Sequence, residues 1–151
     1  MKILSILLLT FYSSISNLYS QSKIINGRVI DDNLEILPYV SIMLNDSVQV
    51  GKTDLNGFFQ ISIPISINKI FFSAVGIEPA SIELMDKCNE AEVVMMLRGT
   101  YCFKTLKKAD RLRMKTFMKL PELHREAFKK NIFKTNNTCY TREFIPDYIK
   151  K

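Results

Sequence analysis

The chain has 151 residues, of which 47% are hydrophobic and 24% are charged, and its formal net charge is +6. This length suits one ordinary domain, and this composition is that of a globular protein, which excludes an intrinsically disordered chain. Residues 21–97 hold five Lys and Arg against ten Asp and Glu, whereas residues 98–151 hold fifteen against five. This reversal of charge predicts a change of architecture near residue 98.

The first twenty residues have the pattern of a secretory signal peptide. Lys2 precedes an apolar run at residues 3–11, and a serine-rich stretch then leads to Leu18 and Ser20 ahead of Gln21. The apolar run is too short to cross a bilayer, which takes about 20 helical residues. We therefore predict that residues 1–20 are removed on export. The alternative is an uncleaved membrane anchor.

Residues 21–97 contain short apolar runs separated by turn residues. Several alternate between two faces, as in residues 40–44, where Val40, Ile42 and Leu44 face opposite to Ser41 and Met43. Seven runs are expected as strands: KIINGRVID, YVSIML, VQVGKT, FFQISI, NKIFFSAVG, ASIEL and EVVMML. Because they recur roughly every 8–12 residues with no helical stretch between them, we predict a mainly β fold, a seven-stranded antiparallel sandwich.

The stretch GKTDLNGFFQISI, residues 51–63, joins two of these strands and raises the question of a metal site. An EF-hand calcium loop needs oxygen ligands at alternate positions and a bidentate Glu at the end of its 12 residues. Counted from Asp54, that last place is held by Ile65. We therefore interpret Asp54, Asn56 and Gly57 as a structural turn. Asp54 would accept main-chain hydrogen bonds, Asn56 would tolerate the left-handed region, and Gly57 would adopt a positive φ.

The order of these motifs resembles the carboxypeptidase-regulatory-like, or transthyretin-like, domain. The resemblance covers residues 24–97 and rests on five features: a first strand ending in G-x-V-x-D, a proline-led second strand, the turn T-D-x-x-G-x-F, the strand I-x-F-S-x-x-G, and a final run of valines and leucines. It implies a non-catalytic sandwich, as found at the N-terminus of TonB-dependent receptors and in other Gram-negative envelope proteins. The basic segment after residue 97 departs from the receptor pattern. Without a zinc peptidase domain, the resemblance implies no peptidase activity.

Residues 98–151 are expected to form a basic helical extension, because the hydrophobic period changes there. One helix is predicted over residues 103–119, with Pro121 either ending it or starting a second helix over residues 121–133. The apolar sector of the first helix, residues 103–119, contains Phe103, Leu106, Ala109, Met114 and Phe117, with Asp110 and Arg113 intruding on it. Its opposite side gathers six cations: Lys104, Lys107, Lys108, Arg111, Lys115 and Lys119.

Two interpretations of this basic side are open. It is either a solvated surface whose apolar reverse packs on the sandwich, or a contact for anionic material such as lipid headgroups, acidic polysaccharide or an acidic partner. Nucleic acid would be attracted by similar charge. Export argues against nucleic acid as a partner, and no motif for binding it is present.

The chain has three cysteines, Cys88, Cys102 and Cys139, so at most one intramolecular disulfide can form. Export would favour such a bond, and we predict Cys102 with Cys139 because both lie in the C-terminal segment. A Cys/His zinc site is not expected, since His124 is the single histidine and no CxxC pair exists. Serine-hydrolase, phosphate-loop and H-E-x-x-H patterns are also lacking. We therefore predict no enzyme and no cofactor.

These observations together predict a secreted, non-enzymatic protein of a Gram-negative cell envelope, in the periplasm or at the outer membrane. It would act as a binding or assembly module whose partner is another envelope protein. The alternative function is peripheral attachment to an anionic membrane or polysaccharide through the basic helices. A role for the unpaired thiol is a third, remote hypothesis.

Overall fold

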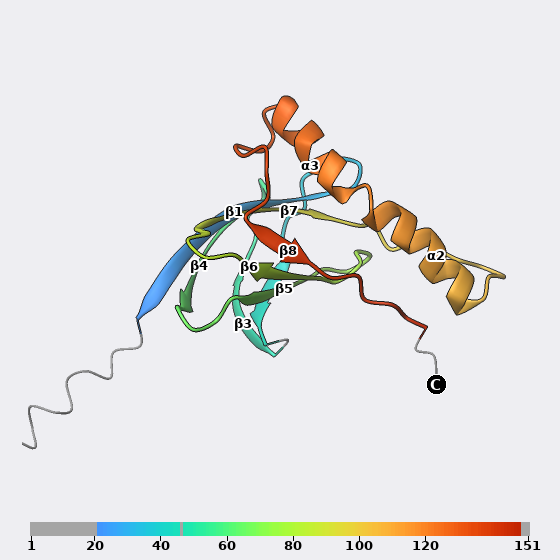
Figure 1. The fold of residues 1–151 in the computed structure, drawn as a ribbon, viewed down its shortest axis with the longest axis horizontal. Coiled ribbons are helices and arrows are strands. Elements are labelled where there is room, and N and C mark those ends of the chain that lie inside the picture. Colours follow the sequence, from blue (N-terminus) through green and yellow to red (C-terminus); the bar gives the residue numbers. More distant parts are fainter. Residues whose placement is uncertain (1–20, 46, 149–151) are drawn as a thin grey trace, which may run out of the picture.

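The computed structural model describes residues 21–45 and 47–148, and it shows a mainly β protein built on two sheets (Figure 1). The three-stranded sheet has the order β4-β1-β7 and consists of β1 (Ser22–Asp31), β4 (Phe58–Pro64) and β7 (Glu90–Met95). The five-stranded sheet has the order β3-β2-β5-β6-β8 and consists of β2 (Ser41–Leu44), β3 (Val48–Lys52), β5 (Lys69–Ser73), β6 (Ala80–Leu84) and β8 (Tyr140–Arg142). The signal peptide predicted at residues 1–20 lies outside the described residues.

The core lies between the two sheets, where alternate side chains of each strand meet. Phe59 of β4 and Phe72 of β5 cross this interface with ring centroids 5.7 Å apart, edge to face. Both rings are buried, as are Ile25 and Val29 of β1 and Ile42 of β2. Each side chain of this kind contributes about 1.5–3 kcal/mol when it is fully removed from water. The two-residue period of the apolar positions therefore places one face of every strand in this core.

Strand direction differs from the prediction in one sheet. β1 pairs antiparallel with β4 but parallel with β7, with Arg28 opposite Glu92. The prediction of a wholly antiparallel sandwich is therefore wrong. A parallel pair needs a long crossover between its strands, and here all of β2 to β6 lies between β1 and β7 in the sequence.

The two helices follow β7 and precede β8. Helix α2 (Leu106–Phe117) begins after Thr105, whose hydroxyl oxygen accepts the N–H of Lys108 at 3.4 Å. Helix α3 (Leu120–Lys129) carries Pro121 in its first turn, so this proline starts the second helix. The helices meet at an elbow next to β7 (Figure 1).

Helix α3 covers the outer face of the three-stranded sheet. Leu120, Ala127 and Phe133 form a second buried cluster with Ile30 of β1 and Val94 of β7. These two strand residues point away from the sandwich core, because their neighbours Val29 and Val93 occupy it. The molecule therefore has three layers at this point, one of helix and two of sheet (Figure 1).

The C-terminal segment also supplies a strand, which the prediction of a helical extension did not include. β8 pairs antiparallel with β6, with Tyr140 opposite Leu84. From β8, the Tyr140 hydroxyl donates to the carbonyl of Glu92 and the Arg142 guanidinium donates to the carbonyl of Val94. Both acceptors lie on β7, which would otherwise be a free edge of its sheet. Side chains from β8 of the five-stranded sheet thus hydrogen-bond to carbonyl groups at the β7 edge of the three-stranded sheet.

The disulfide joins Cys88 to Cys139, with Cα atoms 5.5 Å apart. The predicted bond between Cys102 and Cys139 is therefore wrong. Cys139 immediately precedes β8, and the pairing of β8 with β6 brings it to Cys88 in the loop between β6 and β7. Cys102 lies before α2 and is a free, exposed cysteine.

Candidate functional site

The turn between β3 and β4 is a main-chain structure held by Asp54. Its carboxylate accepts the N–H groups of Asn56 and Phe58, both at 2.8 Å, and Gly57 adopts φ 74°. The positive φ predicted for Gly57 is confirmed, and Asn56 does not adopt the left-handed conformation. Across the residues that the structure describes, no group of three or more His, Cys, Asp or Glu is placed to hold a metal ion.

The six cations of the predicted basic side are all exposed: Lys104, Lys107, Lys108, Arg111, Lys115 and Lys119. Within the described ranges, none of the six forms an ion pair. The side of α2 that they occupy also carries Met118, which is 74% exposed. We call this surface the basic face of α2. Its charge is free to act on a partner.

The side of α2 that was predicted to be apolar faces the protein, but only part of its apolar side chains is buried. Leu106 and Met114 are 58% and 38% exposed, and Phe103 is fully exposed ahead of the helix. The buried residues of the helix are Ala109, Asp110 and Arg113. The two charged residues that interrupt the apolar sector thus face the protein together with Ala109, and Phe117 is partly buried against the second cluster.

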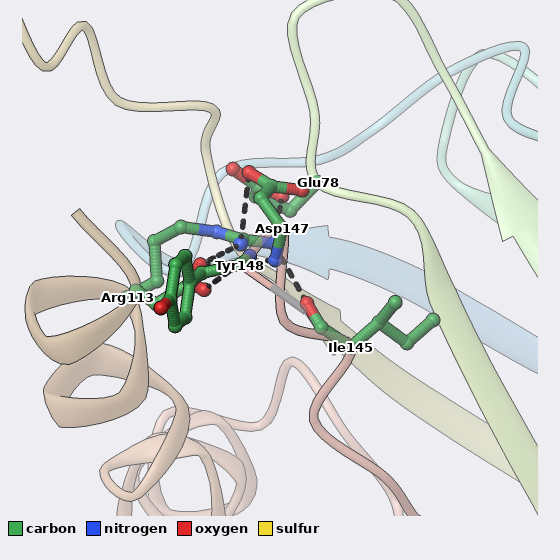
Figure 2. A network of polar contacts seen from close by, with 6 residues as sticks. Glu78, Arg113, Ile145, Asp147 and Tyr148 are labelled. Carbon is green, nitrogen blue, oxygen red and sulfur yellow. Dashed lines mark hydrogen bonds and ion pairs between the residues drawn. The ribbon is translucent and has the colours of Figure 1, made fainter. Parts of the chain in front are cut away.

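Arg113 is the centre of a polar network that joins α2 to two distant segments (Figure 2). Its guanidinium donates to Glu78 at 2.8 Å, to Asp110 at 2.6 Å and to the carbonyl of Ile145 at 3.2 Å. Asp147 completes the network with an ion pair of 3.0 Å. Figure 2 shows Arg113 reaching from the helix to Glu78 on one side and to the chain after β8 on the other.

The charges of this network are stabilised as ions. Burial alone would raise the pKa of Asp110, but the N–H groups of Tyr148 and Asp147 and the Arg113 guanidinium outweigh it and hold this pKa below its ordinary value. Burial likewise opposes the charge of Arg113, and the carboxylates of Glu78 and Asp110 outweigh it, so that its pKa is raised. The network therefore fastens α2 and the chain after β8 to the sandwich.

His124 is buried between α3 and the segment that follows it, with an exposed fraction of 2%. Its Nε2 lies 3.0 Å from the carbonyl oxygen of Thr135, and burial lowers the pKa of the ring. Because a carbonyl only accepts, Nε2 carries the proton and Nδ1 is an acceptor in the neutral ring. Cys139 is half of the disulfide, so its sulfur is not a free thiol that could act as a nucleophile beside His124.

A pocket of about 180 Å³ opens where the elbow between α2 and α3 faces β7 and β8. Its lining comes from both helices, both strands and the loop before β8: Val94, Phe117, Leu120, Pro121, His124, Thr138, Tyr140 and Arg142. Sequence analysis did not predict this pocket. Four lining residues had been given no role: Leu120, Thr138, Tyr140 and Arg142. The pocket forms only when β8 lies beside β6, and the helical pattern does not indicate this position.

Two packed sheets with a common core define a β-sandwich module, and family comparison agrees. The CarboxypepD_reg-like domain family matches residues 25–100, which is half of the chain. The chain belongs to this family, whose domain is a non-catalytic β-sandwich module, as the resemblance predicted. No curated protein matches the sequence. The described part contains no helix of the length and apolarity needed to cross a membrane.

Proposed function

We propose that this protein is an exported, non-enzymatic module of the Gram-negative cell envelope that binds another envelope protein. The observation that carries the proposal is the match to a non-catalytic sandwich domain over residues 25–100. Export is supported by the pattern of residues 1–20 and, independently, by the disulfide between Cys88 and Cys139. Such bonds persist in oxidising compartments and are rare in the cytoplasm.

The basic face of α2 is the surface we assign to the partner. Its cations are exposed and unpaired within the described chain, so they attract an acidic surface and orient it. Met118 lies exposed among them, and methionine adapts its shape to different apolar partners. An acidic envelope protein with a small apolar patch fits both properties.

The test is cross-linking in intact envelopes followed by affinity capture of the full chain. The informative variant is Lys107→Glu/Arg111→Glu/Lys115→Glu, which reverses the basic face. A matched control, Lys52→Glu/Lys69→Glu/Lys87→Glu, makes the same change of charge at exposed positions of the sandwich. We expect the wild-type protein and the control to capture the same partner and the α2 variant to lose it. Equal capture by all three would overturn the assignment to α2, and capture of no specific protein would overturn the binding function.

Location needs its own measurement. We expect the protein in the periplasm or the outer-membrane fraction, with a mature N-terminus close to Gln21 as read by mass spectrometry of the intact protein. A cytoplasmic protein that retains residues 1–20 would overturn the proposal of export.

A second candidate function is attachment to an anionic surface, and one specific observation favours it. Phe103 is fully exposed beside the exposed Lys104, and an apolar side chain next to cations is what interfacial segments place among lipid headgroups. The full chain would then bind vesicles of anionic phospholipid, or acidic polysaccharide, but not zwitterionic vesicles. Binding would weaken as salt rises above physiological strength, where the screening length is about 8 Å. Binding that ignores salt, or is equal for both lipids, would contradict it.

A further inference from the structure

The pocket at the elbow of α2 and α3 has the size of a small organic molecule. Its volume is about 180 Å³, and an apolar protein cavity of roughly 150 Å³ is known to hold a benzene ring. The body of the pocket is apolar, formed by Val94, Phe117, Leu120 and Pro121. A single ring or a compact branched aliphatic group therefore fits.

A guanidinium lines this pocket without an acidic partner. Arg142 lies with its Cζ 5.6 Å from the centroid of the Phe117 ring, and one of its nitrogens donates to the carbonyl of Val94. Among residues 21–45 and 47–148, no carboxylate forms an ion pair with it. Burial lowers the pKa of Arg142, and the Tyr140 side chain compensates for the lost water only in part.

The contrast with Arg113 shows what Arg142 lacks. Arg113 is buried, whereas Arg142 is partly exposed, and the fold supplies Arg113 with the carboxylates of Glu78, Asp110 and Asp147. A guanidinium offers five N–H donors in a planar fork that matches a carboxylate with two parallel hydrogen bonds. Arg142 uses only part of this capacity on protein acceptors in the described chain.

The remaining polar groups of the pocket are few and partly committed. The Tyr140 hydroxyl donates to the carbonyl of Glu92, and the His124 Nε2 proton is directed at Thr135. The His124 Nδ1 atom is buried and, in the part of the chain that the structure describes, has no partner. A neutral imidazole, a hydroxyl at Thr138 and one guanidinium thus give the pocket one positive charge and no negative one.

We propose that this pocket binds a small organic carboxylate, with the carboxylate on Arg142 and a ring-sized apolar body between Phe117, Leu120 and Val94. The inference goes beyond the proposed protein-binding function, since the lining residues lie apart from the cations of the basic face. Benzoate is the probe with the simplest match to this chemistry. The benzoate carboxylate can accept hydrogen bonds from the Arg142 guanidinium, and the benzoate ring fills the apolar part of the pocket.

His124 provides a direct readout because it lines the pocket and is the single histidine of the chain. We would titrate the untagged mature protein with benzoate and follow the imidazole C–H signals by NMR. Benzamide serves as the uncharged analogue and benzylamine as the cationic one. We expect saturable shifts with benzoate, at least about tenfold weaker binding of benzamide, and no binding of benzylamine. Equal binding of benzoate and benzamide, or no shift of His124 with benzoate, would overturn the proposal.

Two variants test the role of Arg142 once their folding has been verified by circular dichroism. Arg142→Met should abolish the preference for benzoate over benzamide, and Arg142→Lys should keep the preference with weaker binding, because it retains the charge and loses the fork. Arg111→Met removes an exposed arginine of α2 and should bind benzoate as the wild-type protein does. Loss of binding in Arg111→Met would point to general attraction by the basic face and would overturn the assignment. The wild-type titration decides the matter even if Arg142→Met fails to fold.

Discussion

Arg113 of α2 and Glu78 of the loop between β5 and β6 form an ion pair of 2.8 Å in which both side chains are almost completely buried, at 6% and 5% exposure. Glu78 belongs to the part of the chain that matches the sandwich family, whereas Arg113 lies beyond it. The pair therefore anchors the C-terminal segment to the domain. Burying two ions costs much of the energy that their attraction returns, so the pair is weak evidence of net stability. Removing one partner of the pair, in contrast, leaves the other as a buried charge without compensation.

Removing the guanidinium should destabilise the protein strongly. Arg113→Met would leave Glu78 and Asp110 as buried carboxylates without their counter-ion, and breaking such a pair costs about 3–5 kcal/mol. The free energy of unfolding, measured by urea denaturation and circular dichroism, should fall by that order. Arg111→Met, on the exposed side of the same helix, should change it by less than about 0.5 kcal/mol. Similar losses in the two variants would show that the network does not hold the segment.

The single histidine makes the stability depend on pH in a defined direction. Burial lowers the pKa of His124 below its ordinary value of 6.5, so below pH 6.5 the unfolded chain binds more protons than the folded one. The contribution of His124 to stability should therefore be complete above pH 6.5. The free energy of unfolding should decline as the pH falls from 6.5 toward the pKa of His124 in the folded state. NMR titration of the imidazole in untagged protein measures this pKa directly. A value at or above 6.5 would contradict the buried neutral ring.

A control separates this effect from general acid sensitivity. His124→Asn removes the titrating group, so whatever its own stability, it should lose the slope that the wild-type protein shows just below pH 6.5. The pKa of Asp110 is held low by its hydrogen bonds, so its ionisation affects stability at a lower pH than that of His124. Its contribution is complete above its ordinary value of 3.8 and is lost only as the pH falls below that value.

The parts of the fold that rest on local patterns were predictable from the sequence. Each of the seven expected runs overlaps a strand, because alternation of apolar and polar residues reports directly on burial of one face. The side of α2 that faces the protein was also predicted, since its buried residues lie in the expected sector, but the partners of its charged residues were not. Arg113 breaks an apolar pattern, and its role depends on Glu78, which is 35 residues away in the sequence. Only the folded arrangement shows that a charge in the apolar sector has partners.

Strand pairing shows the same limit. The parallel pairing of β1 with β7 and the addition of β8 to β6 depend on contacts between distant segments. β8 is only three residues long, Tyr140–Arg142, which is too short for a periodic signal. The disulfide prediction failed for this reason. Without β8, nothing indicates that Cys139 lies beside Cys88, and the shared position of Cys139 and Cys102 in the C-terminal segment pointed instead to Cys102.

The disulfide should contribute measurably to stability. It joins residues 51 apart in the sequence, and constraining an unfolded loop of this length stabilises the folded state by about 2–4 kcal/mol. Cys139→Ser should lower the free energy of unfolding by that order, whereas Cys102→Ser should leave it unchanged, since Cys102 is exposed and unbonded. Reducing agent should lower the stability of wild-type protein and have no further effect on Cys139→Ser.

Thiol counting checks the pairing independently of stability. With the bond between Cys88 and Cys139 formed, the native oxidised protein should react with one equivalent of a thiol reagent, and the reduced protein should react with three. Cys102→Ser should show no reactive thiol before reduction. A reactive thiol in oxidised Cys102→Ser, or none in the oxidised wild-type protein, would contradict the pairing.

Gly57 should be the least replaceable glycine in a turn of this domain, because two separate constraints act on it. Its φ is 74°, and a Cβ at this position would lie 2.6 Å from the carbonyl oxygen of Val29 and 3.1 Å from the side chain of Ile36. Gly76 has nearly the same φ, 76°, but a Cβ there would have nothing within 4 Å. Gly76→Ala should therefore cost only the left-handed strain, about 1–2 kcal/mol. Gly57→Ala should cost about 3 kcal/mol, since main chain must also move to relieve the clash. Urea denaturation of the two variants measures the difference, and equal losses would mean that the turn at Asp54 can shift away from β1 without penalty.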